Sequence, residues 1–365
     1  MTERFEVVVV GAGVIGLAVA RRLRELGAAP LVLERTGIGA GASGVQPGGV
    51  RLQWGTAVNC RLARESFAFW HEFPERLRAC GYMFVAHSEQ VPARLADNVA
   101  LQNAEGIPSR IVTPDEAAQL VPGLRTATLA GAAWCGEDGY FDRPQTVVEA
   151  FATGAEVRIA TVTALEPDGE GWAAVLAGGE RLAADAVVVA AGAETAPLVA
   201  PLGVMLPIER EERYLFYSEP VRERLVEPLV VSAELRFAAK QLADRRVLAS
   251  DLAAAGDADA SADVWRRNVR GAIRELLPVL EYVTFPLLVP GEYDVTPDRQ
   301  PILGPVPDLP GLHVAAGFSG HGFMLAPAVA RIVGDAVTGA RDPVLDTLGP
   351  ARFAAGRLVP EPAVV

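Results

Sequence analysis

Three glycines near the N-terminus have the spacing of a binding site for a diphosphate. They are Gly11, Gly13 and Gly16, in the run GAGVIG. In this pattern the first glycine permits a tight turn, the second lets a pyrophosphate approach the backbone, and the third lets a helix pack closely on a strand. Glu34 follows at the distance at which a carboxylate accepts hydrogen bonds from ribose hydroxyls. Because an acid there disfavours a 2′-phosphate, the spacing predicts FAD or NAD rather than NADP.

The residues around these glycines predict a β-α-β unit. Residues 6–10 are a β-branched run of strand length, expected to be covered on both faces. Val14 and Ile15 open the helical pattern that follows, so its first N–H groups and the positive end of its dipole face the diphosphate. A second strand over residues 30–33 ends directly before Glu34.

A glycine-rich segment, ERTGIGAGASGVQPGGVR, starts at the end of the second strand. Glycines interleaved with small apolar residues form no regular element but let the backbone approach a bound group closely. A flexible surface loop is the alternative interpretation. A helix predicted over residues 56–77 follows at once, and we expect the segment to lie against the cofactor, which favours FAD over NAD.

The composition excludes several classes of protein. The chain has 365 residues with 33 basic and 45 acidic side chains, a formal net charge of −12 that disfavours nucleic acid as a partner. Its three cysteines lack CxxC spacing, so neither a disulfide framework nor a metal site is expected. Signal-peptide features are missing at the N-terminus, and the uncharged run over residues 7–20 is too short to cross a bilayer. We therefore expect a cytoplasmic protein without a membrane span.

Four stretches of the sequence resemble one family of flavoenzymes. They are the glycine-rich segment, EDGYFD at 137–142, ADAVVVAAGA at 184–193, and YDVTPDRQPILGPVPDLPGLHVAAGFSGHGFMLAPAVARIVGDAV at 293–337. Together they are similar to FAD-dependent amine and amino-acid oxidoreductases of the D-amino-acid oxidase type. That group includes sarcosine oxidase, glycine oxidase and dye-linked proline dehydrogenase. The last stretch is most similar to the sarcosine oxidase branch.

The resemblance implies an α/β fold with two domains. The expected Rossmann-like FAD-binding domain is discontinuous and takes residues 1–80, 135–205 and 295–345. A mixed α+β substrate domain with a large antiparallel sheet takes 81–134 and 206–294, and 346–365 form a C-terminal tail. The pattern of residues in the second domain independently predicts strands at 214–217, 235–238 and 282–289 and a helix at 262–277.

The resemblance also implies which residues contact the cofactor, and most of them are small. They are Gly11, Gly13, Val14, Ile15, Gly16, Glu34, Arg35, Ser43, Gly48, Gly49, Val162, Ala191, Gly192, Gly317, Ser319, Gly320, Gly322, Phe323 and Met324. In this family the flavin lies between the domains, with its ring against the segment matching 317–323. A helix running from there to Val337 would stabilise negative charge on a ring that accepts a hydride. An ordinary glycine-rich helix start is the alternative.

Three further residues are candidates for contacts with the substrate or the flavin ring. Tyr293 matches a pocket tyrosine that hydrogen-bonds a substrate carboxylate or amine, although a lone strand tyrosine is often structural. Arg51 matches an arginine beside the ring, where a permanent positive charge raises the electron affinity of the flavin. His321 is either a hydrogen-bonding partner of the flavin or a packed loop histidine.

The chain departs from the family pattern at three positions. Where one branch attaches its flavin through a cysteine, this chain has Gly291, so noncovalent FAD is expected. Many amino-acid oxidases have an arginine at the position of Tyr293, and sarcosine oxidases have a lysine at that of Met324. Either Arg213 or Arg236 anchors a substrate carboxylate instead, or the substrate is not a simple α-amino acid.

These features predict FAD-dependent oxidation of the C–N bond of an amine or N-substituted amino acid, by hydride transfer to flavin N5. The electrons would pass to oxygen or to another acceptor. FAD-dependent oxidation of a hydroxy acid is one alternative. A second is a flavin-bearing subunit of an electron-transfer complex, and a nonenzymatic NAD sensor is a third. Either a partner subunit or a homo-oligomer is compatible with the sequence.

One lysine, Lys240, stands among the 33 basic residues. Sarcosine oxidases use a lysine near the flavin to promote reaction with oxygen, but that lysine aligns nearer Val247. We expect Lys240 close to the turn of a hairpin over 235–248, where a lysine is usually solvated. A dehydrogenase is therefore as well supported as an oxidase.

Overall fold

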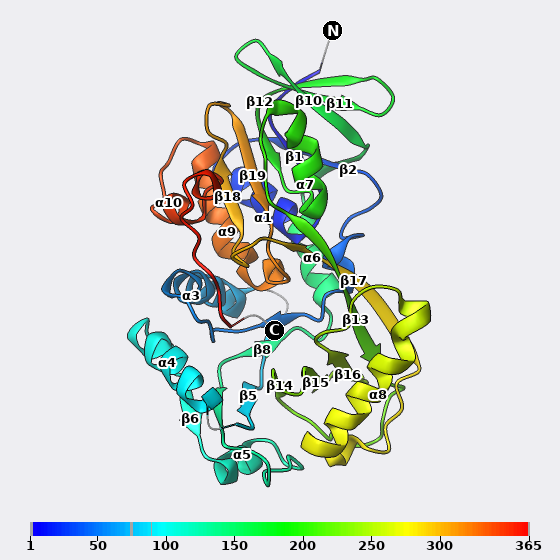
Figure 1. Ribbon diagram of the computed structural model, residues 1–365. Coiled ribbons are helices and arrows are strands. Elements are labelled where there is room, and N and C mark those ends of the chain that lie inside the picture. The colour runs from blue at the N-terminus through cyan, green and yellow to red at the C-terminus, as the bar shows by residue number, and fades with distance from the viewer. Residues whose placement is uncertain (1–2, 74–75, 89, 364–365) are drawn as a thin grey trace. The chain divides into compact units, whose positions relative to one another are not determined.

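The computed structural model describes residues 3–73, 76–88 and 90–363 and divides into two compact units (Figure 1). Unit 1 comprises the residues up to Gln46, Arg143–Glu211 and Glu292–Glu361. Unit 2 comprises Pro47–Asp142, Glu212–Gly291 and the residues from Pro362 onward. The division falls within two strands, β13 (Glu209–Tyr217) and β17 (Leu287–Val295). None of the described helices is long and apolar enough to cross a membrane.

Unit 1 contains an eight-stranded mixed sheet. Its strands are β1 (Arg4–Val10), β2 (Pro30–Glu34), β9 (Glu156–Ile159), β10 (Val162–Asp168), β11 (Gly171–Leu176), β12 (Arg181–Val189), β18 (Ile302–Pro305) and β19 (Leu312–Ala316). Five of them are parallel neighbours in the order β9-β2-β1-β12-β19, with Val8 of β1 opposite Leu31 and Val187. The strands β18, β11 and β10 add antiparallel pairs. This arrangement confirms the predicted Rossmann-like sheet.

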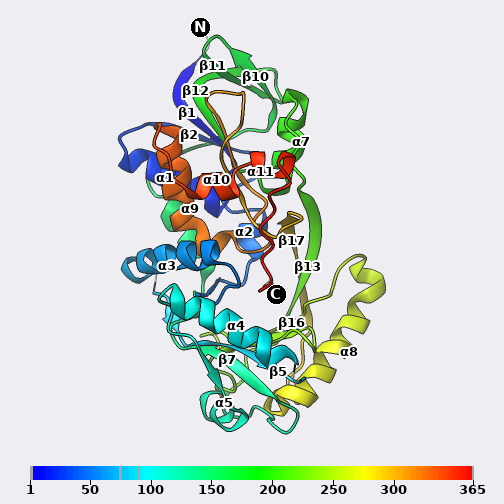
Figure 2. The ribbon, with the colours of Figure 1, turned by 60° about the vertical axis from the view of Figure 1, so that its left-hand side comes forward.

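Helices cover both faces of this sheet, which is why its central strands β1 and β12 end in buried runs of valine. On one face α1 (Val14–Glu25) packs against α9 (Gly322–Val337), as Figure 2 shows. A salt bridge of 2.8 Å between Arg22 and Asp335 joins the two helices. Val199 of α7 (Thr195–Val199) packs in the core cluster that also holds Val8 and Val187. The remaining helices of unit 1 are α2 (Ala42–Val45), α6 (Pro144–Ala152), α10 (Val344–Leu348) and α11 (Ala351–Ala354).

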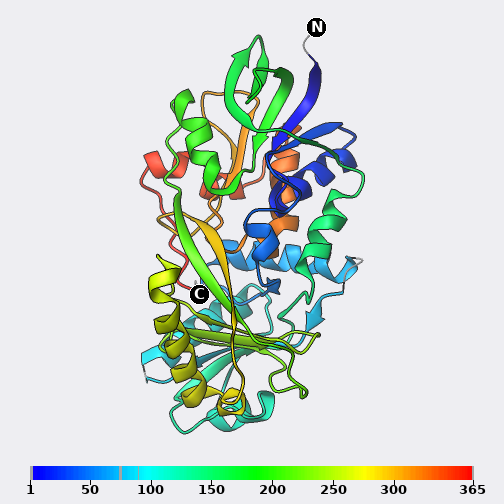
Figure 3. The same cartoon turned by 90° about the vertical axis from the view of Figure 1, so that its right-hand side faces the viewer.

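Unit 2 contains a second eight-stranded sheet, which Figure 3 shows with α8 (Ala258–Leu276) beside it. The strand order is β17-β13-β16-β15-β14-β5-β7-β6. The strands not yet named are β5 (Tyr82–Ala86), β6 (Arg110–Val112), β7 (Gly131–Cys135), β14 (Leu229–Ser232), β15 (Phe237–Gln241) and β16 (Val247–Asp251). Most neighbouring strands in this order are antiparallel, and β14 with β5 is parallel. Trp265 of α8 stacks on Tyr214 at 4.5 Å, which ties the helix to the sheet.

A small three-stranded sheet in unit 2 joins distant parts of the chain. It consists of β3 (Gly49–Val50), β8 (Gly139–Tyr140) and β4 (Arg78–Ala79). Unit 2 also contains α3 (Ala57–Glu72), α4 (Gln90–Ala104) and α5 (Pro114–Leu120), and the last two contact β6 and β7. Trp70 of α3 packs on Phe141 directly after β8. The described residues of 47–80 and 135–142, which we assigned to the FAD-binding domain, therefore pack in unit 2.

The C-terminal tail was expected to be separate from both domains, but its described residues up to Glu361 pack in unit 1. Asp298 and Arg352 form a buried ion pair of 2.9 Å, which fixes the tail to the motif at 293–300. Residues 346–361 accordingly belong to unit 1, and residues 364–365 lie outside the described part of the chain.

Several predicted elements have different limits in the structure. The strand expected at 235–238 is β15 at 237–241, because Arg236 has a φ of +51° and lies in the turn. The strand expected at 282–289 is β17, which begins at Leu287. The helix expected at 56–77 is α3, after which Phe73 is extended; residues 74–75 lie outside the description. The helix expected at 262–277 is α8 and begins at Ala258.

We predict that Gly16→Ala destabilises the chain, because a Cβ at Gly16 would lie 1.9 Å from the carbonyl oxygen of Gly11. The expected loss is about 2–3 kcal/mol in the free energy of unfolding, measured by denaturation. Gly178→Ala is the matched control, since no heavy atom lies within 4 Å of the added Cβ. Equal stability of the two variants would contradict the close packing of α1 on the turn after β1.

Candidate functional site

The predicted cofactor-binding residues of unit 1 gather at one edge of its sheet. Each of the five parallel strands ends at or shortly before one of them: Gly11 after β1, Glu34 in β2, Val162 after β9, Ala191 after β12 and Gly317 after β19. Parallel strands place their carboxyl ends at the same edge, where open α/β sheets bind their ligands. The sheet therefore brings together segments that are far apart in the sequence.

The turn between β1 and α1 has the compact form that its glycines predict. Gly11 has a φ of +108°, and its N–H donates to the carbonyl of Leu33 at 2.8 Å. A Cβ at Gly11 would lie 2.5 Å from the carbonyl oxygen of Ala190. Gly13 is the N-cap residue of α1. Val14 and Ile15 begin that helix, so its positive dipole end lies at this edge of the sheet.

Glu34 is held by backbone N–H groups at the end of β2. Its Oε2 accepts from the N–H of Ala12 at 2.9 Å, and its Oε1 accepts from the N–H of Thr36 at 2.9 Å. Burial alone would raise the pKa of this carboxyl, but the hydrogen bonds from Ala12 and Thr36 lower it overall. Glu34 is therefore ionised at neutral pH and lies directly beside the glycine turn.

The segment after Glu34 folds back onto the same turn. The N–H of Gly39 donates to the carbonyl of Ala12 at 2.9 Å. Ser43 Oγ accepts from the N–H of Val14 at 2.9 Å, in the first turn of α1. Arg35 is more exposed and forms a 3.6 Å ion pair with Glu194. Ser43 is thus placed at the start of α1, whereas Arg35 points to a partner beyond β12.

The ends of β9 and β12 contribute three of the expected residues. The N–H of Ala191 donates to Thr195 Oγ1 at 3.1 Å. Gly192 has a φ of +58°, and nothing lies within 4 Å of the place where its Cβ would be. The backbone is therefore open to a neighbouring group at this point. Val162 is half-buried at the start of β10, after the end of β9.

The loop between β19 and α9 is built around Tyr293 and its neighbour Asp294. A Cβ at Gly320 would lie 2.4 Å from the Tyr293 ring, so only glycine admits the ring there. Asp294 accepts from the N–H of Gly317 at 2.7 Å through Oδ2 and from that of Phe318 at 3.1 Å through Oδ1. Both Gly317 and Gly320 have positive φ angles. Tyr293 is thereby placed at the entrance to α9.

Asp294 was not among the predicted site residues, although it stands inside the YDVTPD motif that carried the resemblance. Burial raises its pKa to about 6, even though the N–H groups of Gly317 and Phe318 favour the carboxylate. It fixes the loop rather than facing a ligand. Its position next to Tyr293 in the motif is the signal that sequence reasoning passed over.

The remaining residues of this loop take structural positions around the helix start. Ser319 is fully buried with a φ of +51°, and its Oγ accepts from the N–H of Thr296 at 3.3 Å. His321 is the N-cap residue of α9 and is 6% exposed. Gly322 packs on the ring of Phe318, Phe323 is buried, and Met324 is half-buried.

In unit 2, Gly48, Gly49 and Arg51 lie on one short segment that includes β3. Gly48 has a φ of +76°, and a Cβ at Gly49 would lie 2.2 Å from the hydroxyl of Tyr82. The guanidinium of Arg51 lies 4.3 Å from the centre of the Trp54 ring. Arg51 is 3% exposed, and it donates to the carbonyl of Ala363 at 2.6 Å.

Asp138 supports this segment and was also not predicted. It is fully buried and accepts from the N–H of Leu52 at 2.6 Å and from Gln53 Nε2 at 2.9 Å. Burial raises the pKa of this carboxyl to about 7. The acid stands in the EDGYFD stretch, but its partner lies 86 residues away in the sequence, so no local pattern identifies its role.

Lys240 lies close to the hairpin turn, as expected, but it is buried rather than solvated. The side chain lies in β15 and is 2% exposed. The turn of this hairpin follows directly after Gln241, where the N–H of Arg245 donates to the carbonyl of Leu242. Of the two arginines considered as carboxylate anchors, Arg236 is exposed in a turn, and Arg213 is half-buried with its NH1 on the Glu212 carbonyl.

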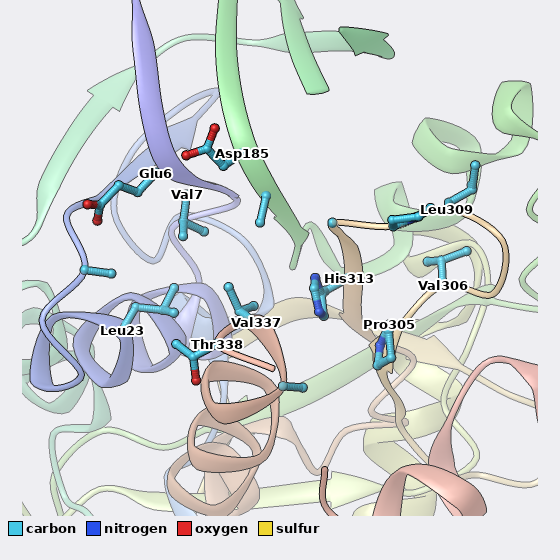
Figure 4. Close-up of a pocket in the computed structure, with 15 residues that line it drawn as sticks. Glu6, Val7, Leu23, Asp185, Pro305, Val306, Leu309, His313, Val337 and Thr338 are labelled. Carbon is cyan, nitrogen blue, oxygen red and sulfur yellow. The ribbon is translucent and has the colours of Figure 1, made fainter. Parts of the chain in front are cut away.

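Figure 4 shows a pocket of about 630 Å³ in unit 1. It is lined by Glu6 in β1, by Gly311 and His313 at the start of β19, and by Val337 and Thr338 at the end of α9. Glu6, Gly311 and His313 lie toward the amino ends of the parallel strands. Ligand sites of α/β sheets lie at the carboxyl ends, so this pocket is not the dinucleotide site.

The residues present fit FAD. A side chain at Gly11 would fill the turn after β1, and glycine leaves that space free. The ionised Glu34 lies beside this turn, and the backbone at Gly192 is open to a neighbouring group. Among the described residues, no group of three or more His, Cys, Asp or Glu side chains is placed to hold a metal ion.

Comparison with known proteins also indicates an FAD-dependent oxidoreductase over nearly the whole chain. A family model described as "FAD dependent oxidoreductase" (DAO) matches residues 6–336. Glycine oxidase of Pseudomonas aeruginosa is 29% identical over 98% of this chain and 100% of its own. Glycine oxidase of Geobacillus kaustophilus is 28% identical over 92% of this chain and 94% of its own.

Solved structures are similar as well. L-proline dehydrogenase from P. horikoshii has a TM-score of 0.90 and 25% identity, covering 98% of this chain and 100% of that one. The crystal structure of the Geobacillus kaustophilus glycine oxidase has a TM-score of 0.84 and 27% identity, covering 94% and 96%. The fold, the residues gathered at the sheet edge and these matches agree, and the chain belongs to the DAO family of FAD-dependent oxidoreductases.

Proposed function

We propose that this FAD-dependent oxidoreductase oxidises the C–N bond of an amine or amino acid, including N-substituted amino acids. FAD, when bound, supplies the acceptor for the hydride equivalent. The electrons then pass to oxygen or to another acceptor. Gly291 stands where a covalent link would need a cysteine, which supports noncovalent FAD.

The observation that carries the proposal is the contact between Tyr293 and Gly320. It places a phenol at the entrance to α9, in a loop whose backbone is fixed by Asp294. A tyrosine hydroxyl donates and accepts hydrogen bonds, so it suits both the carboxylate and the neutral amine of an amino acid. Glycine oxidases and a proline dehydrogenase among the similar proteins support this class of substrate.

The other residues at the carboxyl edge of the unit 1 sheet would bind and orient the cofactor. In our proposal the turn at Gly11–Gly16 and the start of α1 bind the diphosphate, and Glu34 accepts the ribose hydroxyls. The start of α9 supplies positive potential where negative charge develops. Because orientation and electrostatics carry this reaction, no acid–base triad is required.

Anaerobic reduction of the purified flavoprotein tests the substrate class. We expect at least one primary amine, N-methyl amino acid or cyclic amino acid to bleach the oxidised flavin absorbance. Hydroxy acids of matched size are the control and are expected to leave it unchanged. Bleaching by hydroxy acids alone would overturn the proposal, and reoxidation in air would distinguish oxygen from another acceptor.

Substitution of Glu34 tests its role in FAD binding. Glu34→Ala removes the ionised acceptor beside the turn and is expected to weaken FAD binding about tenfold to a hundredfold, the scale of a charged hydrogen bond. Glu34→Gln keeps an oxygen for the N–H of Ala12 and is expected to weaken it less. Quenching of flavin fluorescence measures both dissociation constants; unchanged affinity in Glu34→Ala would exclude the role.

Asp294→Asn tests the support of the Tyr293 loop. An amide offers one oxygen to the two N–H groups of Gly317 and Phe318 and does not ionise, so we expect the stability of the variant to vary little with pH between 4 and 6. Since the folded-state pKa is raised from 3.8 to about 6, the stability contributed by the protonated acid is lost as pH rises through 6. The wild type should therefore lose more stability than the variant between about pH 4 and 6. Parallel pH profiles would contradict this assignment.

A further inference from the structure

Lys240, the single lysine of the chain, has two close partners in unit 2. Its Nζ donates a hydrogen bond to the carbonyl oxygen of Pro47. The same ammonium lies 4.0 Å from the centre of the Tyr140 ring, in the geometry of a cation–π interaction. Only 2% of the surface of Lys240 is exposed, so the Pro47 carbonyl and the Tyr140 ring replace water around its ammonium.

A lysine is a costly way to fill this space. Burial of an ammonium loses hydration, and a carbonyl and a ring compensate for it only in part. A methionine of similar length would pack against Tyr140 without that cost. Unlike methionine, lysine can donate a hydrogen bond to the carbonyl of Pro47. This hydrogen bond connects Lys240 to the turn that begins at Pro47.

That turn is fixed at each of its three residues. Gly48, whose φ is +76°, accepts at its carbonyl from the N–H of Phe141 at 2.9 Å. Gly49 pairs with Tyr140 between β3 and β8. Lys240 holds the carbonyl of Pro47, the residue next to the glycines. Lys240 thus completes the set of contacts along the turn.

The strand that carries Lys240 is itself tied to β8. The hydroxyl of Tyr140 donates to the carbonyl of Gln241 at 2.6 Å, and Gln241 is fully buried. Arg78 NH1 donates to the same hydroxyl at 3.2 Å. These hydrogen bonds fix the strand that carries Lys240, so its ammonium has a defined position from which it can hold another segment.

We propose that Lys240 is a positioning residue, whose ammonium holds the Pro47 carbonyl and thereby sets the backbone of Gly48 and Gly49 for the flavin. The proposal rests on the proposed function, in which FAD is the cofactor, and on the expectation from the family resemblance that Gly48 and Gly49 contact it. No direct contact of Lys240 with substrate or cofactor is required.

The charge of Lys240 makes this role dependent on pH. The groups facing it are Asp142, which favours the charged form, Arg78, which disfavours it, and Cys80 and Tyr140. Burial lowers its pKa to about 7. An ammonium donates a stronger hydrogen bond than a neutral amine, so the turn is held most firmly at low pH. By linkage, FAD affinity falls as pH rises above 7, and bound FAD raises the pKa of Lys240.

Two variants separate positioning from packing. Lys240→Met keeps the length of the side chain and removes the donor, and it is expected to weaken FAD binding about tenfold at pH 6.5. Lys240→Arg keeps a permanent cation and is expected to restore most of the affinity without the pH dependence between 6.5 and 9. Arg246→Met is the control, since it removes a cation from the exposed turn of the same hairpin.

Flavin fluorescence titration of the apoprotein gives the dissociation constants, and thermal denaturation reports folding separately. Lower thermal stability of Lys240→Met with unchanged FAD affinity and an unchanged pH profile would overturn the proposal. If the wild type binds no FAD, the proposed function fails instead, which keeps the two failures distinct.

A direct measurement on the wild type needs no variant. Because Lys240 is the only lysine, protein labelled with ¹⁵N-lysine gives one side-chain signal, whose titration reports this ammonium alone. We expect a pKa near 7 in the apoprotein and a rise of about one unit with FAD, equivalent to a tenfold change in affinity. An identical titration with and without FAD would overturn the proposal even if Lys240→Met does not fold.

Discussion

The close approach of α1 to the turn after β1 is the constraint on which the rest of unit 1 depends. At Gly16 there is no room for even one more carbon atom, because the carbonyl of Gly11 occupies the space. This contact aims the first turn of α1 at the edge where the five parallel strands end. Strand pairing then places Glu34, Gly192 and Gly317 along the same edge. One steric condition near the N-terminus thus orients α1 toward an edge that strand pairing assembles from across the chain.

Buried carboxylates perform a second task, the fixing of irregular backbone. Asp294 binds the N–H groups at the start of the α9 loop, and Asp138 binds Leu52 in unit 2. Asp298 accepts from Arg352 and so attaches the tail to unit 1. Loops that approach a ligand cannot pair as strands do, and side-chain acceptors supply the missing partners. The raised pKa values of Asp294 and Asp138 reflect the cost of this burial.

Lys240 illustrates the limit of reasoning from local sequence. Its neighbours suggest a hairpin, and a lysine near a hairpin turn is ordinarily solvated. The turn does follow directly after Gln241, yet Lys240 is buried against Pro47, which lies 193 residues away in the sequence. Nearness to a turn therefore does not decide whether this charge is exposed, because its partner comes from a distant segment.

From the sequence, glycine spacing and apolar strands predict the N-terminal β-α-β unit, because these signals act over short distances in the chain. The resemblance to enzymes of the D-amino-acid oxidase type indicates the fold class and the family. Only tertiary packing assigns the described residues of 47–80 and 135–142 to unit 2, where β3 pairs with β8 and Trp70 packs on Phe141. It also decided which carboxylates support which loops and where the lone lysine lies. These outcomes depend on partners far apart in the sequence, whose meeting is settled by packing and burial rather than by local spacing.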